Sequence, residues 1–318
     1  MAGGWNFRPC LNLKTENFMK LGTNLLFEKE LGYVESMKLA AKAGFGYVDF
    51  DLTGNYNPEP KDEERFFTGL KRATENEGMK ISQTHAPYVK KISEGYSDFT
   101  DGRFIESIKT AVRRAKILGA EYTVLHLNTP YPENYENVPY DYDIFKADNF
   151  KVCADVLNSL KPTLKEYGIV ALLEDVVAYD FVNRMHKAGP CCTAEECNAY
   201  IDLLGEEYFG VCLDVGHLNA VKGESISEYV SKLGKRIRAL HLHDNFGMLN
   251  DWFGELDRHL PPFFGCVKWR ELSESLKSVG YDGVYSFECN SYGRKEYAAE
   301  FYGYLSRAGK DIFYGDNK

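Results

Sequence analysis

The sequence predicts an α/β fold, a single (β/α)8 TIM barrel that forms one domain over residues 1–318. Short β-like runs alternate eight times with longer stretches of helical periodicity, a pattern typical of βαβ units and a parallel sheet. Glycine stands where a helix ends and a strand follows, at Gly44, Gly119, Gly168 and Gly280. No linker rich in Pro, Gly or Ser divides the chain.

Eight runs of six or seven residues are the expected strands. In chain order they are Lys20–Leu26, Tyr47–Leu52, Lys80–His85, Tyr122–Leu127, Ile169–Glu174, Phe209–Asp214, Arg238–His243 and Gly283–Glu288. Eight such units fit one closed barrel. A doubly wound open sheet is the alternative, but no GxGxxG motif follows the first strand to support it.

The expected helices lie between these strands and after the last one. Most carry apolar residues at helical spacing, as at Ile105, Ile108, Val112 and Ala115. In chain order they are Tyr33–Ala43, Asp62–Glu77, Arg103–Leu118, Ala147–Tyr167, Thr193–Leu204, Ser225–Leu233, Trp269–Val279 and Glu296–Ala308.

Composition narrows the class of protein. Lys and Arg number 38 against 47 Asp and Glu, and the resulting net charge of −9 weighs against a nucleic-acid partner. No apolar run approaches 18 residues, so we expect no membrane helix. The first ten residues, MAGGWNFRPC, lack the basic and apolar parts of a secretory signal, and we expect a cytoplasmic protein. The sequence leaves open whether the chain forms a homo-oligomer.

The eight cysteines are expected to be reduced, because they are scattered and form no CxxC pair. Cys191, Cys192 and Cys197 stand close together, but their spacing matches no zinc pattern.

Possible metal ligands gather where the predicted strands end, which is where barrel active sites lie. Six of the seven histidines lie on these strands or in the loops that follow them, and only His186 falls elsewhere. Carboxylates end several of the same strands. Imidazoles and carboxylates that converge in this way suit a divalent cation, since buried carboxylates side by side repel without one.

Here the chain resembles the xylose-isomerase-like TIM-barrel superfamily, which includes sugar isomerases, ketose 3-epimerases, inosose dehydratases and apurinic endonucleases. The resemblance covers roughly residues 20–305. It depends on the strand ends Glu174 and Glu288, on Asp214-x-x-His217, on His241-x-x-Asp244-Asn245 and on Gly280-Tyr281-Asp282-Gly283.

The resemblance implies that one divalent metal (Mn²⁺, Zn²⁺, Co²⁺ or Mg²⁺) is held by Glu174, Asp214, His241 and Glu288. His217 would contact substrate or a second metal. We expect His243 to point elsewhere, into a neighbouring pocket or toward an outer shell. His243, Asn128 and Phe263 are further candidates for substrate contacts.

The loop after the seventh strand carries Asp257 and His259, which resemble a pair that holds further zinc ions in apurinic endonucleases. With counterparts at His85 and His126, two to three Zn²⁺ could be bound. The aromatic Phe263 follows in this loop where sugar-acting relatives continue with a Gly-x-Gly motif.

The favoured function is an isomerase or epimerase that acts on a ketose, polyol or related carbohydrate. Glu174 and Glu288 would remove and return a proton through an enediolate, while His217 hydrogen-bonds the charged oxygen. A lyase or dehydratase that acts on an inosose or an oxidised glycoside is the first alternative. A trinuclear-zinc apurinic endonuclease and a sugar-binding barrel without catalysis follow.

A Tyr-rich acidic insert at about 129–146 follows the fourth strand. Its charge would repel phosphate, and its four tyrosines suit a lid over a polyol. A subunit contact and a plain insertion are the other interpretations.

Overall fold

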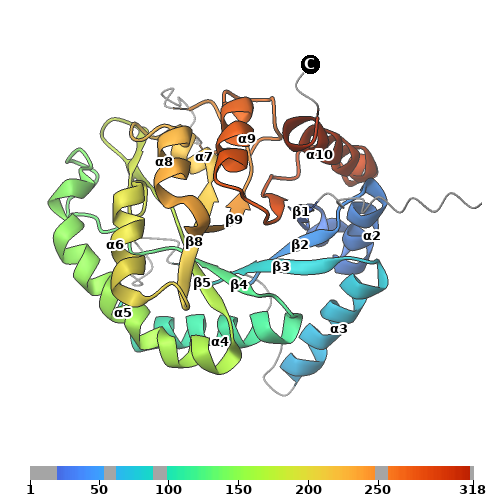
Figure 1. Ribbon diagram of the computed structural model, residues 1–318, viewed down its shortest axis with the longest axis horizontal. Coiled ribbons are helices and arrows are strands. Elements are labelled where there is room, and N and C mark those ends of the chain that lie inside the picture. Colours follow the sequence, from blue (N-terminus) through green and yellow to red (C-terminus); the bar gives the residue numbers. More distant parts are fainter. Residues whose placement is uncertain (1–19, 54–61, 89–98, 248–256, 316–318) are drawn as a thin grey trace, which may run out of the picture.

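The computed structural model describes residues 20–53, 62–88, 99–247 and 257–315. Eight parallel strands there form one sheet in the order β10-β1-β2-β3-β4-β5-β8-β9, with helices around it (Figure 1). The predicted (β/α)8 barrel is therefore confirmed. Cys10 and the MAGGWNFRPC segment lie outside the described residues.

The strands lie close to their predicted positions. They are β1 (Leu21–Asn24), β2 (Tyr47–Asp51), β3 (Lys80–His85), β4 (Tyr122–Leu125), β5 (Val170–Glu174), β8 (Phe209–Asp214), β9 (Ile237–His241) and β10 (Tyr285–Phe287). The sheet closes where Leu242, just after β9, donates its N–H to the Ser286 carbonyl at 2.9 Å and accepts from the Glu288 N–H at 3.1 Å. This closure joins β9 and β10, the two ends of the strand order, so that the carboxyl ends of all eight strands share one rim.

The helices of the described segments are α1 (Glu28–Leu31), α2 (Tyr33–Ala43), α3 (Glu63–Asn76), α4 (Gly102–Leu118), α5 (Lys146–Tyr167), α6 (Ala194–Leu204), α7 (Val215–Ala220), α8 (Ile226–Leu233), α9 (Trp269–Ser278) and α10 (Ala298–Phe313). Ser225 and Glu228 form a capping box that starts α8. The last helix runs beyond the predicted end at Ala308, because Phe313 is buried and stacks on Tyr285 at 4.1 Å. Among the described residues, no helix is both long and apolar enough to cross a membrane.

A hairpin that the sequence did not predict follows β5. Its strands, β6 (Val177–Asp180) and β7 (Met185–Ala188), pair antiparallel outside the barrel sheet. Asp180 holds its turn by accepting the N–H groups of Val182 and Asn183 at 3.0 and 2.9 Å. His186 lies on this hairpin, away from the other histidines of the sequence.

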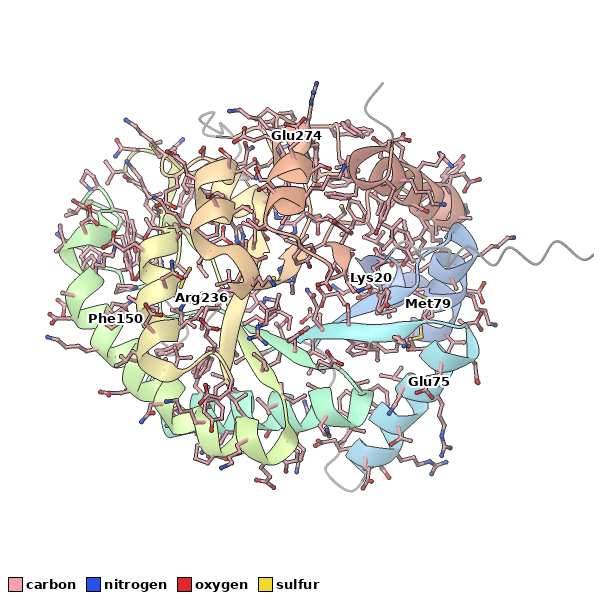
Figure 2. All side chains as sticks on the ribbon, viewed as in Figure 1. Lys20, Glu75, Met79, Phe150, Arg236 and Glu274 are labelled. Carbon is pink, nitrogen blue, oxygen red and sulfur yellow. The ribbon has the colours of Figure 1, made fainter. Side chains whose placement is uncertain are left out.

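Side chains fill the space between strands and helices (Figure 2), and a cavity opens at each end of the barrel. The larger one, about 960 Å³, lies at the amino-terminal ends of the strands around Lys20, Glu75 and Met79, and no histidine is among the described residues that line it. The other, about 800 Å³, lies at the carboxyl ends and is lined by His85, His126, Glu174, His217, His259 and Glu288 among others. Because barrel active sites lie at the carboxyl ends of the strands, we place the candidate site there.

Candidate metal centre

Three groups of donor atoms meet at the carboxyl end of the barrel. Within each group, one ligand atom from every residue lies within 4.8 Å of the others. The groups are Glu174, Asp214, His241 and Glu288; His85, His126 and Glu174; and His217, His243, Asp257 and His259. The structure thus brings together all the metal candidates of the sequence analysis.

The first group gathers around the His241 imidazole. Its Nδ1 lies 2.7 Å from Glu174 Oε1 and 3.2 Å from Glu288 Oε2. Asp214 Oδ2 is 4.0 Å away. His241, Asp214 and Glu174 are buried, whereas a quarter of the Glu288 side chain is exposed to the cavity. Three carboxylates at this spacing need compensating positive charge.

Glu174 connects the first group to the second. Its other oxygen, Oε2, lies 2.6 Å from His126 Nε2 and 3.2 Å from His85 Nε2. The two carboxylate oxygens therefore face different sets of imidazoles, and Glu174 belongs to both donor groups.

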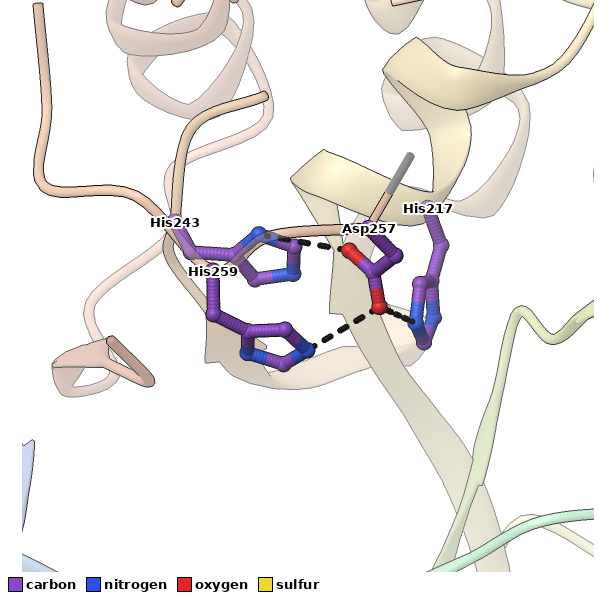
Figure 3. Close-up of side chains that lie close together, drawn as sticks. All are labelled: His217, His243, Asp257 and His259. Carbon is purple, nitrogen blue, oxygen red and sulfur yellow. Dashed lines mark hydrogen bonds and ion pairs between the residues drawn. The ribbon is translucent and has the colours of Figure 1, made fainter. Parts of the chain in front are cut away.

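The third group surrounds Asp257 (Figure 3). Asp257 Oδ2 lies 3.2 Å from His217 Nε2 and 3.0 Å from His259 Nε2, and its Oδ1 lies 3.7 Å from His243 Nδ1. The rings of His243 and His259 stack at 3.8 Å. His243 Nε2 is also 2.9 Å from Asp214 Oδ1, which connects this group to the first. We expected His243 to point into a neighbouring pocket or toward an outer shell. Its ring lies outside the first group, in the third group, and contacts the first-group residue Asp214.

The imidazoles are oriented by main-chain groups. Three of them donate Nδ1–H to carbonyl oxygens: His85 to Ala86 at 2.9 Å, His217 to Asp175 at 2.7 Å and His259 to Glu288 at 2.7 Å. The Nε2 atom of each of these three histidines is therefore left free to face the other possible metal ligands. Ligand histidines typically have one nitrogen fixed in this way while the other binds metal.

The pKa shifts in the site show that its carboxylates stabilise positive charge on the neighbouring imidazoles, as they would stabilise a bound cation. Burial opposes protonation of His85, but the hydrogen bond and charge of Glu174 raise its pKa to about 9. Burial likewise opposes protonation of His259, yet Asp257 raises its pKa to about 10. Burial would raise the pKa of Glu174, but His241 and His126 lower it well below its usual range. Burial raises the pKa of Glu288, and this rise is only partly offset by neighbouring imidazoles.

Some buried polar atoms of the site have no hydrogen-bond partner, among them His243 Nδ1 and Asp257 Oδ1. Unpaired buried polar atoms are rare in proteins and call for an explanation. Both belong to the third group, where a cation would engage them. The nitrogen and oxygen donors fit Mn²⁺, Co²⁺, Zn²⁺ or Mg²⁺.

A family model described as xylose isomerase-like TIM barrel matches residues 37–306. The chain belongs to this family. It is 26% identical to an uncharacterised protein of Methanocaldococcus jannaschii over 273 residues, which are 85% of this chain and 83% of that protein. The fold is shared with a solved D-tagatose 3-epimerase-like protein (TM-score 0.65, 23% identity, 92% of this chain and 100% of the other). It is shared too with a solved IOLI protein with a bound zinc atom (TM-score 0.65, 20% identity, 92% and 98%).

Several residues that support the ligands were not found from the sequence. Asp49 Oδ2 lies 3.0 Å from His241 Nε2 and accepts from Gln83 Nε2 at 2.7 Å. Asp175 accepts the Asp214 N–H at 2.8 Å. Asp49 and Gln83 are polar residues at buried positions inside strands, and that pattern is the signal that could have revealed them.

Asp244 of the His-x-x-Asp motif organises the loop instead of joining the three groups. It accepts the N–H groups of Phe263 and Val267 at 2.9 and 3.0 Å, and the indole N–H of Trp269 at 3.1 Å. These contacts hold the segment from Phe263 to Trp269, and main-chain hydrogen bonds between Asp244 and Leu260 hold the chain next to His259.

The two remaining substrate candidates lie in different surroundings. Asn128 lines the cavity next to His126. Phe263 does not line it, and its ring lies 6.4 Å from the ring of Trp269. Phe263 has φ 71° and donates its N–H to Asp244, and its side chain is exposed. Phe263 therefore does not border the described cavity, and its contact with substrate stays a prediction.

Proposed function

We propose that the protein is a divalent-metal-dependent carbohydrate isomerase or epimerase that acts by proton transfer between two carboxylates. The observation that carries the proposal is that Glu174 and Glu288 both lie beside one imidazole nitrogen, 2.7 and 3.2 Å from His241 Nδ1, and both line an open cavity. Two carboxylates so placed could serve the two faces of one substrate carbon.

Glu174, Asp214, His241 and Glu288 would hold the catalytic cation. When bound, this cation would polarise the substrate carbonyl and so acidify the neighbouring C–H bond. Either carboxylate can take the proton from one face while the other returns one to the opposite face. His217, whose Nδ1–H is fixed by the Asp175 carbonyl at 2.7 Å, presents Nε2 toward Asp257 and the cavity, where it can stabilise the oxygen that gains charge.

The experiment is deuterium exchange in D₂O with Mn²⁺-loaded protein and D-tagatose, chosen for the D-tagatose 3-epimerase-like structural relative. We expect deuterium to enter a C–H bond of the sugar, and we expect a chelator to abolish the exchange. Turnover without deuterium in the product would refute the two-carboxylate mechanism. An eliminated product would instead identify the lyase alternative, which begins with the same proton abstraction.

The completeness of the second and third groups favours one further candidate, a trinuclear-zinc hydrolase that cleaves abasic DNA. The net charge of −9 and the lack of Lys or Arg among the described residues that line the cavity weigh against it. Elemental analysis of protein purified without chelator separates the two candidates. About one metal per chain favours the isomerase, and three zinc ions with cleavage of an abasic duplex would favour the hydrolase.

A further inference from the structure

Four aromatic residues line the candidate-site cavity together and form what we call the aromatic wall, namely Tyr131, Tyr135, Tyr179 and Phe181. Their rings form a continuous series: Tyr131 to Tyr135 at 6.0 Å, Tyr135 to Phe181 at 4.9 Å and Phe181 to Tyr179 at 5.0 Å. Two of them come from the insert after β4 and two from the hairpin after β5. The catalytic proposal uses none of these side chains.

The wall is preorganised. The Tyr131 hydroxyl accepts the Tyr179 N–H at 2.7 Å, which joins the insert to the hairpin. Asp180 fixes the hairpin turn directly after Tyr179. Phe181 nevertheless stays 39% exposed, beside a cavity, although an aromatic ring gains by burial. A rigid aromatic surface that stays partly exposed in this position is suited to a ligand.

The wall lies next to the metal ligands. Tyr131 follows His126 by five residues in the segment after β4, and Tyr179 on β6 follows Glu174, the last residue of β5, by five residues; β4 and β5 are adjacent in the sheet. Five residues of extended chain span at most about 18 Å. Tyr88 stacks on His126 at 4.4 Å, so an aromatic ring also lies directly against one of the possible metal ligands.

The cavity is large, and its described lining has neither of the two side chains, Lys and Arg, that usually hold phosphate. Its volume of about 800 Å³ falls in the upper part of the roughly 300–1,000 Å³ range that accommodates drug-sized ligands. Among the described residues that line it there is no Lys or Arg, and Asp51 and Asp257 add negative charge. Phosphorylated ligands are typically held by Arg, Lys or a helix N-terminus.

We propose that the site takes an uncharged glycoside of at least two rings, with the reacting sugar at the metal groups and the second ring stacked on the aromatic wall. This inference rests on the proposed function, which places the reacting sugar at the metals. The second ring can be a sugar, through its C–H face, or an aryl group. Both present an apolar face to the wall.

The test measures binding to Mn²⁺-loaded protein by titration calorimetry. D-fructose, D-fructose 6-phosphate and lactulose share one ketose and differ in a phosphate or a second sugar ring. Methyl and phenyl β-D-glucopyranoside supply the aryl comparison. We expect lactulose or the phenyl glycoside to bind at least about tenfold more tightly than its one-ring counterpart, and the phosphate to bind no better than D-fructose. Equal affinity for one-ring and two-ring ligands, or tightest binding of D-fructose 6-phosphate, would overturn the inference.

Phe181→Ala tests the wall itself, and Phe264→Ala is its matched control. Phe264 is also an exposed phenylalanine, at 58%, but it does not line the cavity and contacts Tyr304. We expect Phe181→Ala to weaken lactulose binding about threefold to tenfold more than D-fructose binding, and Phe264→Ala to change neither. Equal losses in the two Phe variants, or no differential loss in Phe181→Ala, would refute the wall.

Deuterium exchange separates this inference from the proposed function. Exchange into D-fructose and lactulose with equal kcat/KM leaves the proposed function standing and removes the two-ring preference. If lactulose binding depends on the aromatic wall but no sugar exchanges deuterium, the two-ring preference stands and the proposed function fails.

Discussion

The substitution Gly216→Ala tests the placement of His243 in the third donor group. A Cβ at Gly216 would lie 1.9 Å from His243 Cε1 and 2.3 Å from its Nδ1. Carbon atoms pack at roughly 3.5–4.0 Å, so the ring would have to move by about 2 Å. His243 is fully buried, contacts Asp214 Oδ1 at 2.9 Å and stacks on His259 at 3.8 Å. Movement on this scale breaks both contacts.

The expected loss follows from these contacts. Overpacking a filled site costs about 1–3 kcal/mol, and a hydrogen bond to a charged group contributes about 1.5–3 kcal/mol. Because the two effects share one ring they do not add fully, and we expect Gly216→Ala to lower the free energy of unfolding by about 2–4 kcal/mol. The displaced ring also takes a nitrogen donor out of the third group, which should weaken the metal bound there at least about tenfold.

Urea unfolding of protein treated with a chelator measures the loss of stability, and titration with metal measures the loss of metal affinity. Gly69→Ala is the control, because Gly69 lies exposed inside α3 with open space around its Cβ position. It should gain about 0.5–1 kcal/mol from helix propensity. A Gly216→Ala variant that unfolds at the wild-type urea concentration and binds the same number of metal ions would refute the position of His243 in the site.

Three further results are expected. Glu174→Gln and Glu288→Gln should each reduce deuterium exchange about 10²–10⁴-fold, and wild-type exchange in either would exclude it as a base. The pKa values of about 9 for His85 and about 10 for His259 keep these imidazoles protonated at neutral pH in the metal-free protein. A metal ion must displace these protons, so the affinity for metal should rise with pH toward 9–10. The two protonated imidazoles also stabilise the metal-free protein. This stabilisation is fully present below the unfolded pKa of about 6.5 and should be lost as the pH rises to 9–10. Calorimetry of metal binding in buffers of different ionisation enthalpy detects the released protons, and an affinity for metal that does not change with pH would contradict this expectation. Asp244→Asn turns a carboxylate oxygen into a donor that faces main-chain N–H groups and should cost about 2–4 kcal/mol in urea unfolding. Wild-type stability would mean that Asp244 does not hold the loop.

The barrel and the identity of the metal candidates could be predicted from the sequence, for one physical reason. In a parallel barrel all strands end at the same rim, so polar residues at strand ends meet in space even when they lie far apart in the chain. His85, Glu174 and Asp214 end strands and could therefore be named without coordinates. The start of helix α8 was also predictable, because its cap Ser225 is a local signal, whereas the end of α10 at Phe313 depends on packing against Tyr285.

What the tertiary structure decided concerns orientation and loops. Strand alternation alone could not place His243, which comes after the last hydrogen-bonded residue of β9 and is positioned by Asp214 and the absence of a Cβ at Gly216. Phe263 was expected at the cavity, but its backbone is set by Asp244, nineteen residues earlier in the chain.

The aromatic wall forms from two segments that are remote in sequence, joined by the bond between the Tyr131 hydroxyl and the Tyr179 N–H. Periodicity records only which residues share a strand or helix face. The conformation of a loop depends on long-range hydrogen bonds and packing, which the local sequence does not encode.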